Sequence, residues 1–443
     1  MSTHSERARQ WVHVGSGAFA FLLRGLTWRE GAALAAVALA FNVLVLPRIG
    51  GRQLYRPVDR ARGFPLGILL YPLAVLMLIL IFSSRLDIAA AAWGILAFGD
   101  GAATLVGQRA DGRRWPWNPD KTIAGSAAFV LFASAGGVLL AWWTRANVSP
   151  PPSLWFVVLA PVVAAFAAAA VEALPVRLDD NISVPAAAAA ILWLASLMTA
   201  DAVHANVAAV ARAAPIALVV NGAVAWAGYR ARSVSISGAV GGAIVGVIIY
   251  AGAGVAAWML LLLAFILASV TSRLGLTRKT LLGIAEERGG RRGAGNAFAN
   301  CGVASLAAVA YVTTPYAAAA MLALATALTA GGSDTVASEI GKAWGRSTFL
   351  VTSLGRVKPG TPGAMSIEGT AAGIVAALTL AVISAGFGLI AANLILAVVV
   401  GATVGALVES ALGATLEEPG ILNNDMLNFI NTGVAAVVAI AIA

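Results

Sequence analysis

Residues 87–107 read DIAAAAWGILAFGDGAATLVG, an apolar stretch long enough to cross a bilayer that carries Asp100 towards its end. A membrane-spanning helix needs about 20 mostly apolar residues, and a carboxylate at membrane depth is costly unless it serves a function. The second half of the chain repeats the pattern in GGSDTVASEIG over 331–341, where Asp334 holds the corresponding place. This repetition predicts a membrane protein with polar sites at the ends of apolar helices.

The composition extends this prediction to the whole chain. Of the 443 residues 60% are hydrophobic and only 11% charged, and the mean hydropathy is +0.87. A soluble domain has about 25% charged residues. We therefore expect an all-α, polytopic integral membrane protein with about fourteen transmembrane helices in two related seven-helix modules. The expected spans are 31–47, 65–83, 87–107, 123–143, 153–172, 183–201, 207–228, 234–251, 254–273, 295–312, 315–332, 368–388, 390–410 and 429–443.

These spans divide the chain into three expected regions. Residues 1–30 should form an N-terminal interfacial segment, because their apolar part is too short to cross a membrane. Residues 31–230 should form the first membrane module and residues 231–443 the second. A short basic stretch, YRARSVS over 229–235, would link the two modules.

The charge pattern predicts an orientation. The formal net charge is +9, and most of the 29 Lys and Arg residues fall in alternate short loops on one side of the expected spans. The positive-inside rule makes that side cytoplasmic, and the same assignment puts both sets of acidic motifs there. We therefore expect sites that face the cytoplasm, in a bacterial plasma membrane. Because the basic residues fit this topological role, we expect no nucleic-acid partner.

Several classes of site are excluded by what the chain lacks. Its single cysteine, Cys301, allows neither an intrachain disulfide nor a thiolate metal cluster. The three histidines form no cluster in the sequence, which argues against a zinc hydrolase. A phosphate loop of the GxxxxGK[ST] type is also absent.

The first module holds three motifs whose residue types suit phosphate and metal chemistry. One is the Gly-Asp pair of residues 87–107, and the second, DKTIAGS over 120–126, puts a lysine and hydroxyl groups at the start of an expected helix, a favourable place for phosphate. The third, VEALPVRLDDN over 171–181, supplies carboxylates for Mg²⁺ or for a general base. The candidates are Gly99, Asp100, Lys121, Thr122, Gly125, Ser126, Glu172, Asp179, Asp180 and Asn181, with Asp100 and Asp180 as metal ligands.

The second module repeats the motif order with a different cationic group. Its acidic candidates are Asp334, Glu339, Glu409 and Asp425, with Asp334 and Asp425 as metal ligands, and Asn424 adds an amide. The stretch KPGTPGAMSIEGT over 358–370 supplies Lys358, Thr361, Ser366, Gly369 and Thr370 for phosphate. A loop that the first module lacks supplies Arg291 and Arg292, which could clamp a phosphorylated substrate, and Asn296 and Asn300 follow one helical turn apart.

Each motif also has a purely structural interpretation. An aspartate at a helix end can be merely solvated, the glycines of 358–370 can form a tight turn, and Arg291 and Arg292 can serve topology alone. The repetition of the same ordered motifs in both halves favours function.

The first module, over about residues 90–200, resembles the CTP-dependent polyprenol kinases, the family of phytol kinase and dolichol kinase. The resemblance rests on GDGAATLVGQ with Asp100, DKTIAGS with Lys121, and EALPVRLDDNISVP with Asp180. The chain has QRADGRR where the family usually has glycine and lysine after the GD motif, so an arginine there would substitute. The resemblance implies Mg²⁺ and CTP, or another nucleoside triphosphate, as phosphoryl donor.

The second module, about residues 233–443, resembles the phytyl-phosphate kinase family through LLGIAEERGGRRGAGNAFAN, GGSDTVASEIGKAWG and PGTPGAMSIEGTAAG. In that family the substrate is an isoprenyl monophosphate and the product a diphosphate. Together the two resemblances imply a bifunctional membrane kinase. It would convert an isoprenoid alcohol such as phytol, geranylgeraniol or farnesol to the monophosphate and then to the diphosphate, within membrane lipid.

Two other functions stay open at this point. One is a cytidylyltransferase that makes CDP-lipids, because that membrane family also uses acidic, Mg²⁺-dependent nucleotide sites. The other is a non-enzymatic lipid transporter, although acidic motifs at one face differ from a binding site at the midplane. The sequence names neither the prenol nor the oligomeric state.

Overall fold

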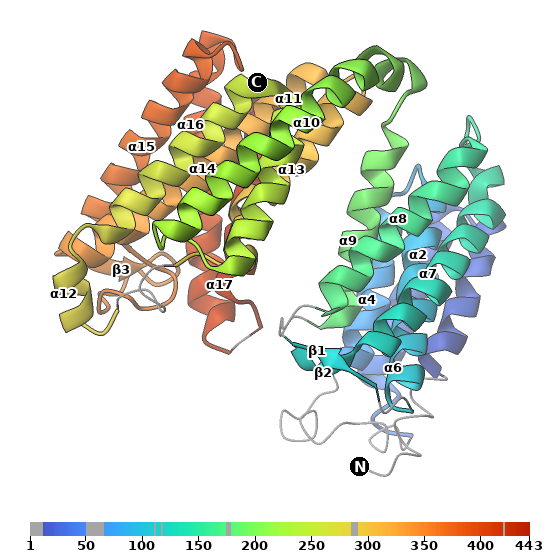
Figure 1. Cartoon of the computed structure of the whole chain (residues 1–443). Coiled ribbons are helices and arrows are strands. Elements are labelled where there is room, and N and C mark those ends of the chain that lie inside the picture. Colours follow the sequence, from blue (N-terminus) through green and yellow to red (C-terminus); the bar gives the residue numbers. More distant parts are fainter. Residues whose placement is uncertain are drawn as a thin grey trace. The chain divides into compact units, whose positions relative to one another are not determined.

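The computed structural model describes residues 12–49, 66–109, 112–116, 118–173, 179–284, 291–419 and 421–443. These residues form two compact helical units, Met1–Ser196 and Leu197–Ala443 (Figure 1). The first contains η1 (Gly17–Arg24), α2 (Trp28–Leu44), α4 (Leu66–Ile81), α5 (Leu86–Gly94), η3 (Ile95–Asp100), α6 (Gly101–Gly107), β1 (Arg114–Trp115), β2 (Asn118–Thr122), α7 (Ile123–Thr144), η4 (Arg145–Asn147), α8 (Leu154–Ala173) and α9 (Asp180–Ser196).

The second unit is larger. It contains α10 (Ala200–Arg230), α11 (Ile236–Arg273), α12 (Leu276–Leu281), α13 (Ala294–Thr313), α14 (Ala317–Trp344), β3 (Thr348–Leu350), β4 (Ala364–Ser366), α15 (Ile367–Gly386), η6 (Ala392–Leu394), α16 (Ile395–Leu412), η7 (Gly413–Glu417) and α17 (Asn424–Ile442). Helix α10 packs along α11, so residues 200–230 belong in space to the second unit. The module boundary at residue 230 rests on the expected spans and on the basic stretch over 229–235, and as a division of activities it stays a prediction.

The protein is an integral membrane protein by the length and composition of its helices. Among the described residues, nine helices are long and apolar enough to cross a membrane, and Val12–Arg24, Gly67–Ile81 and Asp180–Ser196 are shorter apolar helices. Every expected span overlaps a helix. The count of fourteen crossings in two seven-helix modules is not confirmed and stays a prediction. Of the expected interfacial segment, residues 1–11 lie outside the described residues.

Helix α11 contains two helices that run in opposite directions. Gly254, with φ 85° and ψ 178°, breaks the helix in a conformation that essentially only glycine adopts. A straight helix of this length would extend about 57 Å. Instead, Nη2 of Arg273 at its end donates a hydrogen bond of 3.1 Å to Oγ of Ser233, just before its start. The chain therefore folds back at Gly254, between the expected spans 234–251 and 254–273.

Each unit is built around one buried helix. In the first unit Ile88, Ile95 and Leu96 are fully buried, and α7, α8, α9 and α4 surround the helix that contains them. In the second unit Leu324 and its neighbours in α14 are buried in the same way, against α13, α15, α16 and α17. A helix that is apolar on all sides belongs in such a core. These two central helices carry the two aspartate motifs.

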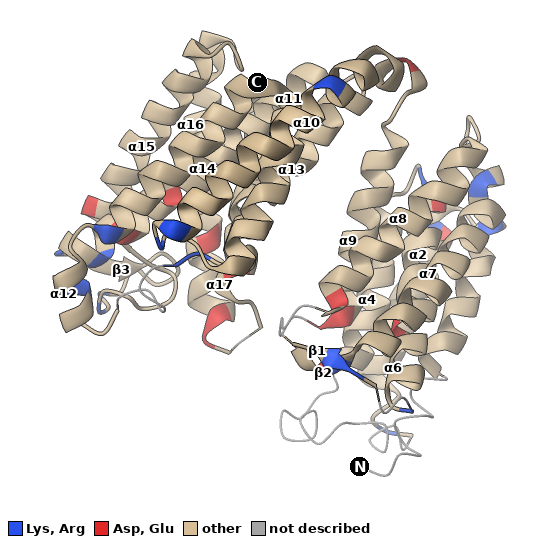
Figure 2. Ribbon diagram, in the orientation of Figure 1, with Lys and Arg blue, Asp and Glu red and all other residues tan. Residues whose placement is uncertain are grey.

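Two short β-hairpins were not expected in an all-α protein. Strand β1 pairs with β2, and β3 pairs with β4, both antiparallel. The second strand of each hairpin ends at the cap of a helix, because Thr122 accepts a hydrogen bond from the N–H of Gly125 and Ser366 accepts one from Gly369, both at 3.0 Å. In the second unit most acidic and basic residues lie at the end where its hairpin lies, whereas the first unit has charged residues at its hairpin end and at the opposite end (Figure 2).

Candidate functional site

The two units share one local arrangement, which brings a capped helix start against the end of the central helix. Gly125 in the first turn of α7 packs on Gly107, since a Cβ on Gly125 would lie 3.5 Å from the Cα of Gly107. In the second unit a Cβ on Gly369 would lie 3.1 Å from the Cα of Gly341. The glycines allow each pair of helices to approach closely. Each aspartate motif therefore ends beside the N-terminus of a capped helix.

Lys121 is the centre of the first acidic cluster. Its Nζ donates hydrogen bonds to Oε1 of Glu172, which is buried, and to Oδ2 of Asp180 at 2.9 Å. Burial lowers the pKa of Lys121, but the charges of Asp180 and Glu172 outweigh it and raise the pKa above its ordinary value. Because this pKa is raised, the lysine stays protonated throughout the physiological pH range. Three residues predicted from two separate motifs thus meet in space.

The neighbouring aspartate has a different role. Oδ1 of Asp179 accepts hydrogen bonds from the backbone N–H of Asn181 at 3.0 Å and from its Nδ2 at 2.7 Å. Asn181 Nδ2 also donates to the carbonyl of Gly67 at 3.4 Å. Asp179 and Asn181 therefore fix the start of α9 and its contact with α4. Of the predicted aspartate pair, only Asp180 binds Lys121.

Asp100 lies next to this cluster and contacts a group that the motif search missed. Its Oδ2 is 3.6 Å from Nε2 of His13, and its charge acts on Asp180. The ring of His13 lies 4.5 Å from that of Tyr71, whose hydroxyl accepts a hydrogen bond of 2.8 Å from Nε1 of Trp93. No sequence motif connects His13 and Tyr71 with Asp100, because they come from the start of the chain and from α4, whereas Trp93 lies in the same central helix as Asp100.

The other candidates of the first unit pack or cap in the described structure. A Cβ on Gly99 would come within 3.0 Å of the Phe129 ring, so this glycine allows close packing of α7. The Ser126 hydroxyl accepts a hydrogen bond of 3.0 Å from Nε1 of Trp115, which ties β1 to α7. Thr122 caps that helix. These residues shape the packing around the site.

The second acidic cluster has a pair of facing carboxylates. Asp334 and Glu409 share a side-chain hydrogen bond, and Nδ2 of Asn431 donates to Oε2 of Glu409 at 2.7 Å. Two carboxylates in contact need either a shared proton or a cation to offset their repulsion. Lys342 acts electrostatically on Asp334 and on Glu417. The cluster therefore combines a carboxylate pair with a nearby cation, as the first does.

Glu339 stands apart from this pair. Its carboxylate binds the buried Lys279 through Oε2 and Lys342 through Oε1, the latter at 3.2 Å. Lys279 also donates to the carbonyl of Ser272 at 2.7 Å. Glu339 is thus the acceptor of a buried ion-pair network between α12 and α14.

A cavity of about 270 Å³ collects most of the polar candidates of the second unit. Its lining includes the predicted residues Arg292, Asn296, Asp334, Thr361, Ser366, Thr370, Glu409 and Asn424, and also Ser338, Lys342, Glu417 and Asn428, which the motifs did not indicate. Glu339, Asp425, Arg291, Asn300, Lys358 and Gly369 are not part of this lining. Asp425 instead contacts Gly295 at the start of α13. Lys342 could have been recognised from its place one helical turn after Glu339.

Gly363 closes the loop that forms one wall of this cavity. Its φ is +69°, and a Cβ would overlap the carbonyl oxygen of Ser410 and the amide nitrogen of Ala414. We expect Gly363→Ala to destabilise the loop by about 1–3 kcal/mol and to disturb the cavity, because both the backbone conformation and the close approach exclude a side chain. Thermal unfolding of the purified variant measures this. Gly386→Ala is the control, since its Cβ meets no atom within 4 Å, and an equal loss in both variants would contradict the prediction.

Each cluster offers carboxylates that could hold a metal ion only together with ligands from outside the protein. Within the described residues, no group of three or more His, Cys, Asp or Glu side chains could hold a metal ion. Mg²⁺ commonly takes one or two carboxylates and completes its shell with waters and substrate phosphates. Asp334 with Glu409, and Asp100 with Asp180, offer such carboxylates next to a cationic side chain.

The sequence is similar to a family of membrane proteins and to several individual proteins. The family described as "Integral membrane protein DUF92" matches residues 219–436. An uncharacterized membrane protein of Synechocystis sp. is 41% identical over 202 residues, which are 45% of this chain and 78% of that protein. Protein VTE6, chloroplastic, of Arabidopsis thaliana is 34% identical over 213 residues, 46% of this chain and 64% of that protein.

A probable phytol kinase, chloroplastic, of Triticum aestivum is 33% identical over 134 residues, which are 29% of this chain and 43% of that protein. The chain therefore covers less than two thirds of the length of either plant protein. No solved structure matches the chain.

Proposed function

Through residues 219–436 the chain belongs to the integral membrane protein DUF92 family, and from this premise we propose that it is a membrane-embedded isoprenoid kinase. The first unit would transfer a phosphoryl group from a nucleoside triphosphate, CTP by resemblance, to an isoprenoid alcohol. The second would transfer another phosphoryl group to the monophosphate. Each step breaks the bond between the γ-phosphorus of the donor and its bridging oxygen, forms one P–O bond to the acceptor and releases a nucleoside diphosphate. The first step also releases the hydroxyl proton.

The observation that carries this proposal is the arrangement that occurs in both units. In each, an aspartate of the central helix lies near a second carboxylate, a lysine lies beside them, and the capped N-terminus of another helix packs on the central helix close to its end. Phosphoryl transfer needs mainly positioning and neutralisation of charge. Cationic side chains and the N-terminal ends of helices are groups that bind the phosphates of a nucleotide donor.

In the first unit we assign the donor phosphates to Lys121, which immediately precedes the capped start of α7. Glu172 and Asp180 keep Lys121 charged and in place. When the donor binds, one of its phosphates would replace these carboxylates as the hydrogen-bond partner of Lys121. Glu172, relieved of the lysine, would accept the proton of the attacking hydroxyl. Asp100 would hold Mg²⁺ together with Asp180.

In the second unit the corresponding lysine position is taken by Met365, and Lys342 supplies the cation from α14. Asp334 and Glu409 would hold Mg²⁺, and Ser366 and Thr370 line the same cavity with their hydroxyls. Mg²⁺ supplies charge neutralisation between the donor phosphates when it is bound. The nucleophile here is a phosphate oxygen, so this unit needs no strong base.

The test is turnover by the purified full-length protein. We expect labelled phosphate to pass from the γ-position of a nucleoside triphosphate to a prenol and then to the prenyl monophosphate, when CTP, ATP, GTP and UTP are each offered with prenols of different lengths and with Mg²⁺. EDTA should stop both steps. Release of pyrophosphate with a CDP-lipid would identify a cytidylyltransferase instead. Movement of lipid between membranes without nucleotide turnover would identify a transporter.

A further inference from the structure

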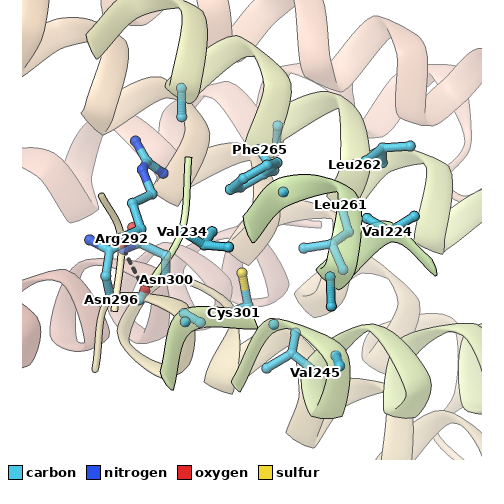
Figure 3. A pocket seen from close by; sticks show the side chains of 18 of the residues that line it. Val224, Val234, Val245, Leu261, Leu262, Phe265, Arg292, Asn296, Asn300 and Cys301 are labelled. Atoms are coloured by element: carbon cyan, nitrogen blue, oxygen red, sulfur yellow. Dashed lines mark hydrogen bonds between the residues drawn. The ribbon is translucent and has the colours of Figure 1, made fainter. Parts of the chain in front are cut away.

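An apolar pocket in the second unit adjoins the carboxylate cavity. Its volume is about 130 Å³, and helices α10, α11, α13 and α14 line it. Figure 3 shows Arg292, Asn296 and Asn300 together at one end, while Val224, Val245, Leu261 and Leu262 line the remainder. The side chain of Asn300 donates a hydrogen bond of 3.0 Å to the carbonyl of Asn296. Apart from Asn221, whose amide is hydrogen-bonded to the Ala217 carbonyl and to Trp258, the pocket is apolar with one polar end.

The polar end is the border between the apolar pocket and the carboxylate cavity. Arg292 and Asn296 line both. A ligand with its apolar part among α10, α11 and α13 would therefore present its head to the cavity that contains Asp334 and Glu409. Because the guanidinium is permanently charged and offers several donors, Arg292 favours an anionic head such as a phosphate.

The first unit has a pocket of the same kind with a different polar end. Its volume is about 430 Å³, and its apolar lining comes from η1, α2 and α4. The polar end contains His13, Ser16, Tyr71 and Asn181, and His13 reaches Asp100. Among the described residues that line it, none is Lys or Arg. This end suits a neutral hydroxyl group, for which imidazole, phenol and amide groups are ordinary hydrogen-bond partners.

We propose, on the basis of the proposed function, that these two pockets hold the isoprenoid tail and that their polar ends select the head. The first would accept the alcohol at His13, Tyr71 and Asn181. The second would accept the monophosphate at Arg292 and Asn296. Among the described residues, the permanent cation at the polar end of the second pocket then separates the two substrates of an otherwise similar chemistry.

The decisive variant is Arg292→Gln, measured in steady-state kinetics of the full-length protein. The KM for geranylgeranyl monophosphate should rise about 10- to 100-fold, the usual effect of losing a charge-assisted hydrogen bond. The KM for geranylgeraniol should not change. Arg292→Lys should recover part of the affinity, and Arg278→Gln, which removes an exposed arginine of the same unit, should have no effect. An unchanged KM for the monophosphate, or equal rises for both substrates, would overturn the proposal.

The tail site is tested with a matched pair of glycines. Gly242 in α11 lines the apolar pocket and Gly222 in α10 does not, and a Cβ on either would meet no atom within 4 Å. Gly242→Leu should raise the KM for the 20-carbon monophosphate at least tenfold, and the KM for a five-carbon monophosphate should rise less. Gly222→Leu should leave both KM values unchanged. Equal effects at both chain lengths, or a similar effect of Gly222→Leu, would contradict a tail site here.

This proposal and the proposed function fail in different ways. If the unmodified protein makes no phosphorylated product, the kinase assignment fails, and equilibrium binding of geranylgeranyl monophosphate without nucleotide still tests the pocket through the same variants. If it does turn over and Arg292→Gln behaves like the unmodified protein, only the selection by Arg292 fails. Displacement of the bound monophosphate by phosphatidylglycerol at equal concentration would show a general lipid site and overturn the selection.

Discussion

Replacing Asp334 with asparagine is expected to slow formation of the diphosphate by about 10³-fold and to leave formation of the monophosphate unchanged. Asp334 lines the polar cavity and shares a hydrogen bond with Glu409. Asparagine keeps the shape of the side chain but removes the charge that would hold the magnesium–nucleotide complex, a loss of about 4 kcal/mol in the transition state. Asp100→Asn should give the reverse result, because its cluster lies in the other compact unit.

Two exposed acidic residues provide matched controls for these variants. Asp120 precedes Lys121 in β2, and Glu418 follows η7. Asp120→Asn and Glu418→Gln remove the same charge near each cluster without touching it, so both steps should stay within about twofold of the unmodified rates. Labelled mono- and diphosphate products are separated and counted. Loss of both steps in Asp100→Asn or in Asp334→Asn would contradict two independent sites.

Replacing Glu339 with glutamine is expected to destabilise the second unit by about 3–5 kcal/mol, because the substitution leaves the buried ammonium of Lys279 without its carboxylate. Lys279→Met should cost less, since Lys342 still neutralises Glu339 from 3.2 Å. The double variant Lys279→Met/Glu339→Gln removes both buried charges and should regain most of the lost stability. Thermal unfolding of the purified proteins gives the comparison.

The same variants decide whether Glu339 takes part in catalysis. The sequence motifs predict Glu339 as an acidic catalytic residue, whereas in the structure it belongs to an ion-pair network outside the cavity lining. If its role is to hold α12 against α14, the double variant should make diphosphate at close to the normal rate. A stable double variant without activity would restore Glu339 to the catalytic group.

Helix positions could be predicted from the sequence because a helix in a bilayer must satisfy its own backbone hydrogen bonds over a fixed length. Each expected span overlaps a helix. Even the fold-back in α11 was implicit in the two spans that meet near Gly254. The hairpins were missed, because strands as short as Thr348–Leu350 have no periodicity to detect.

The sequence could predict which residues belong to the candidate sites, but not which other side chains they contact. Carboxylates in apolar surroundings are unusual enough to be recognised from sequence, and Asp100, Asp180, Asp334 and Glu409 were. Their partners come from distant parts of the chain. His13 approaches Asp100. In the second cluster the cation is Lys342 of α14, and it does not come from the position that corresponds to Lys121.

By itself, then, the sequence determined that this protein is a helical membrane protein with acidic groups at helix ends, because the bilayer imposes length and apolarity locally along the chain. Only the tertiary structure decided which of those groups meet. Glu339 is neutralised by two lysines while Asp334 faces Glu409, and Arg292 stands where an apolar pocket joins a polar cavity. Such differences depend on distances between side chains from separate helices, and no local pattern specifies those distances.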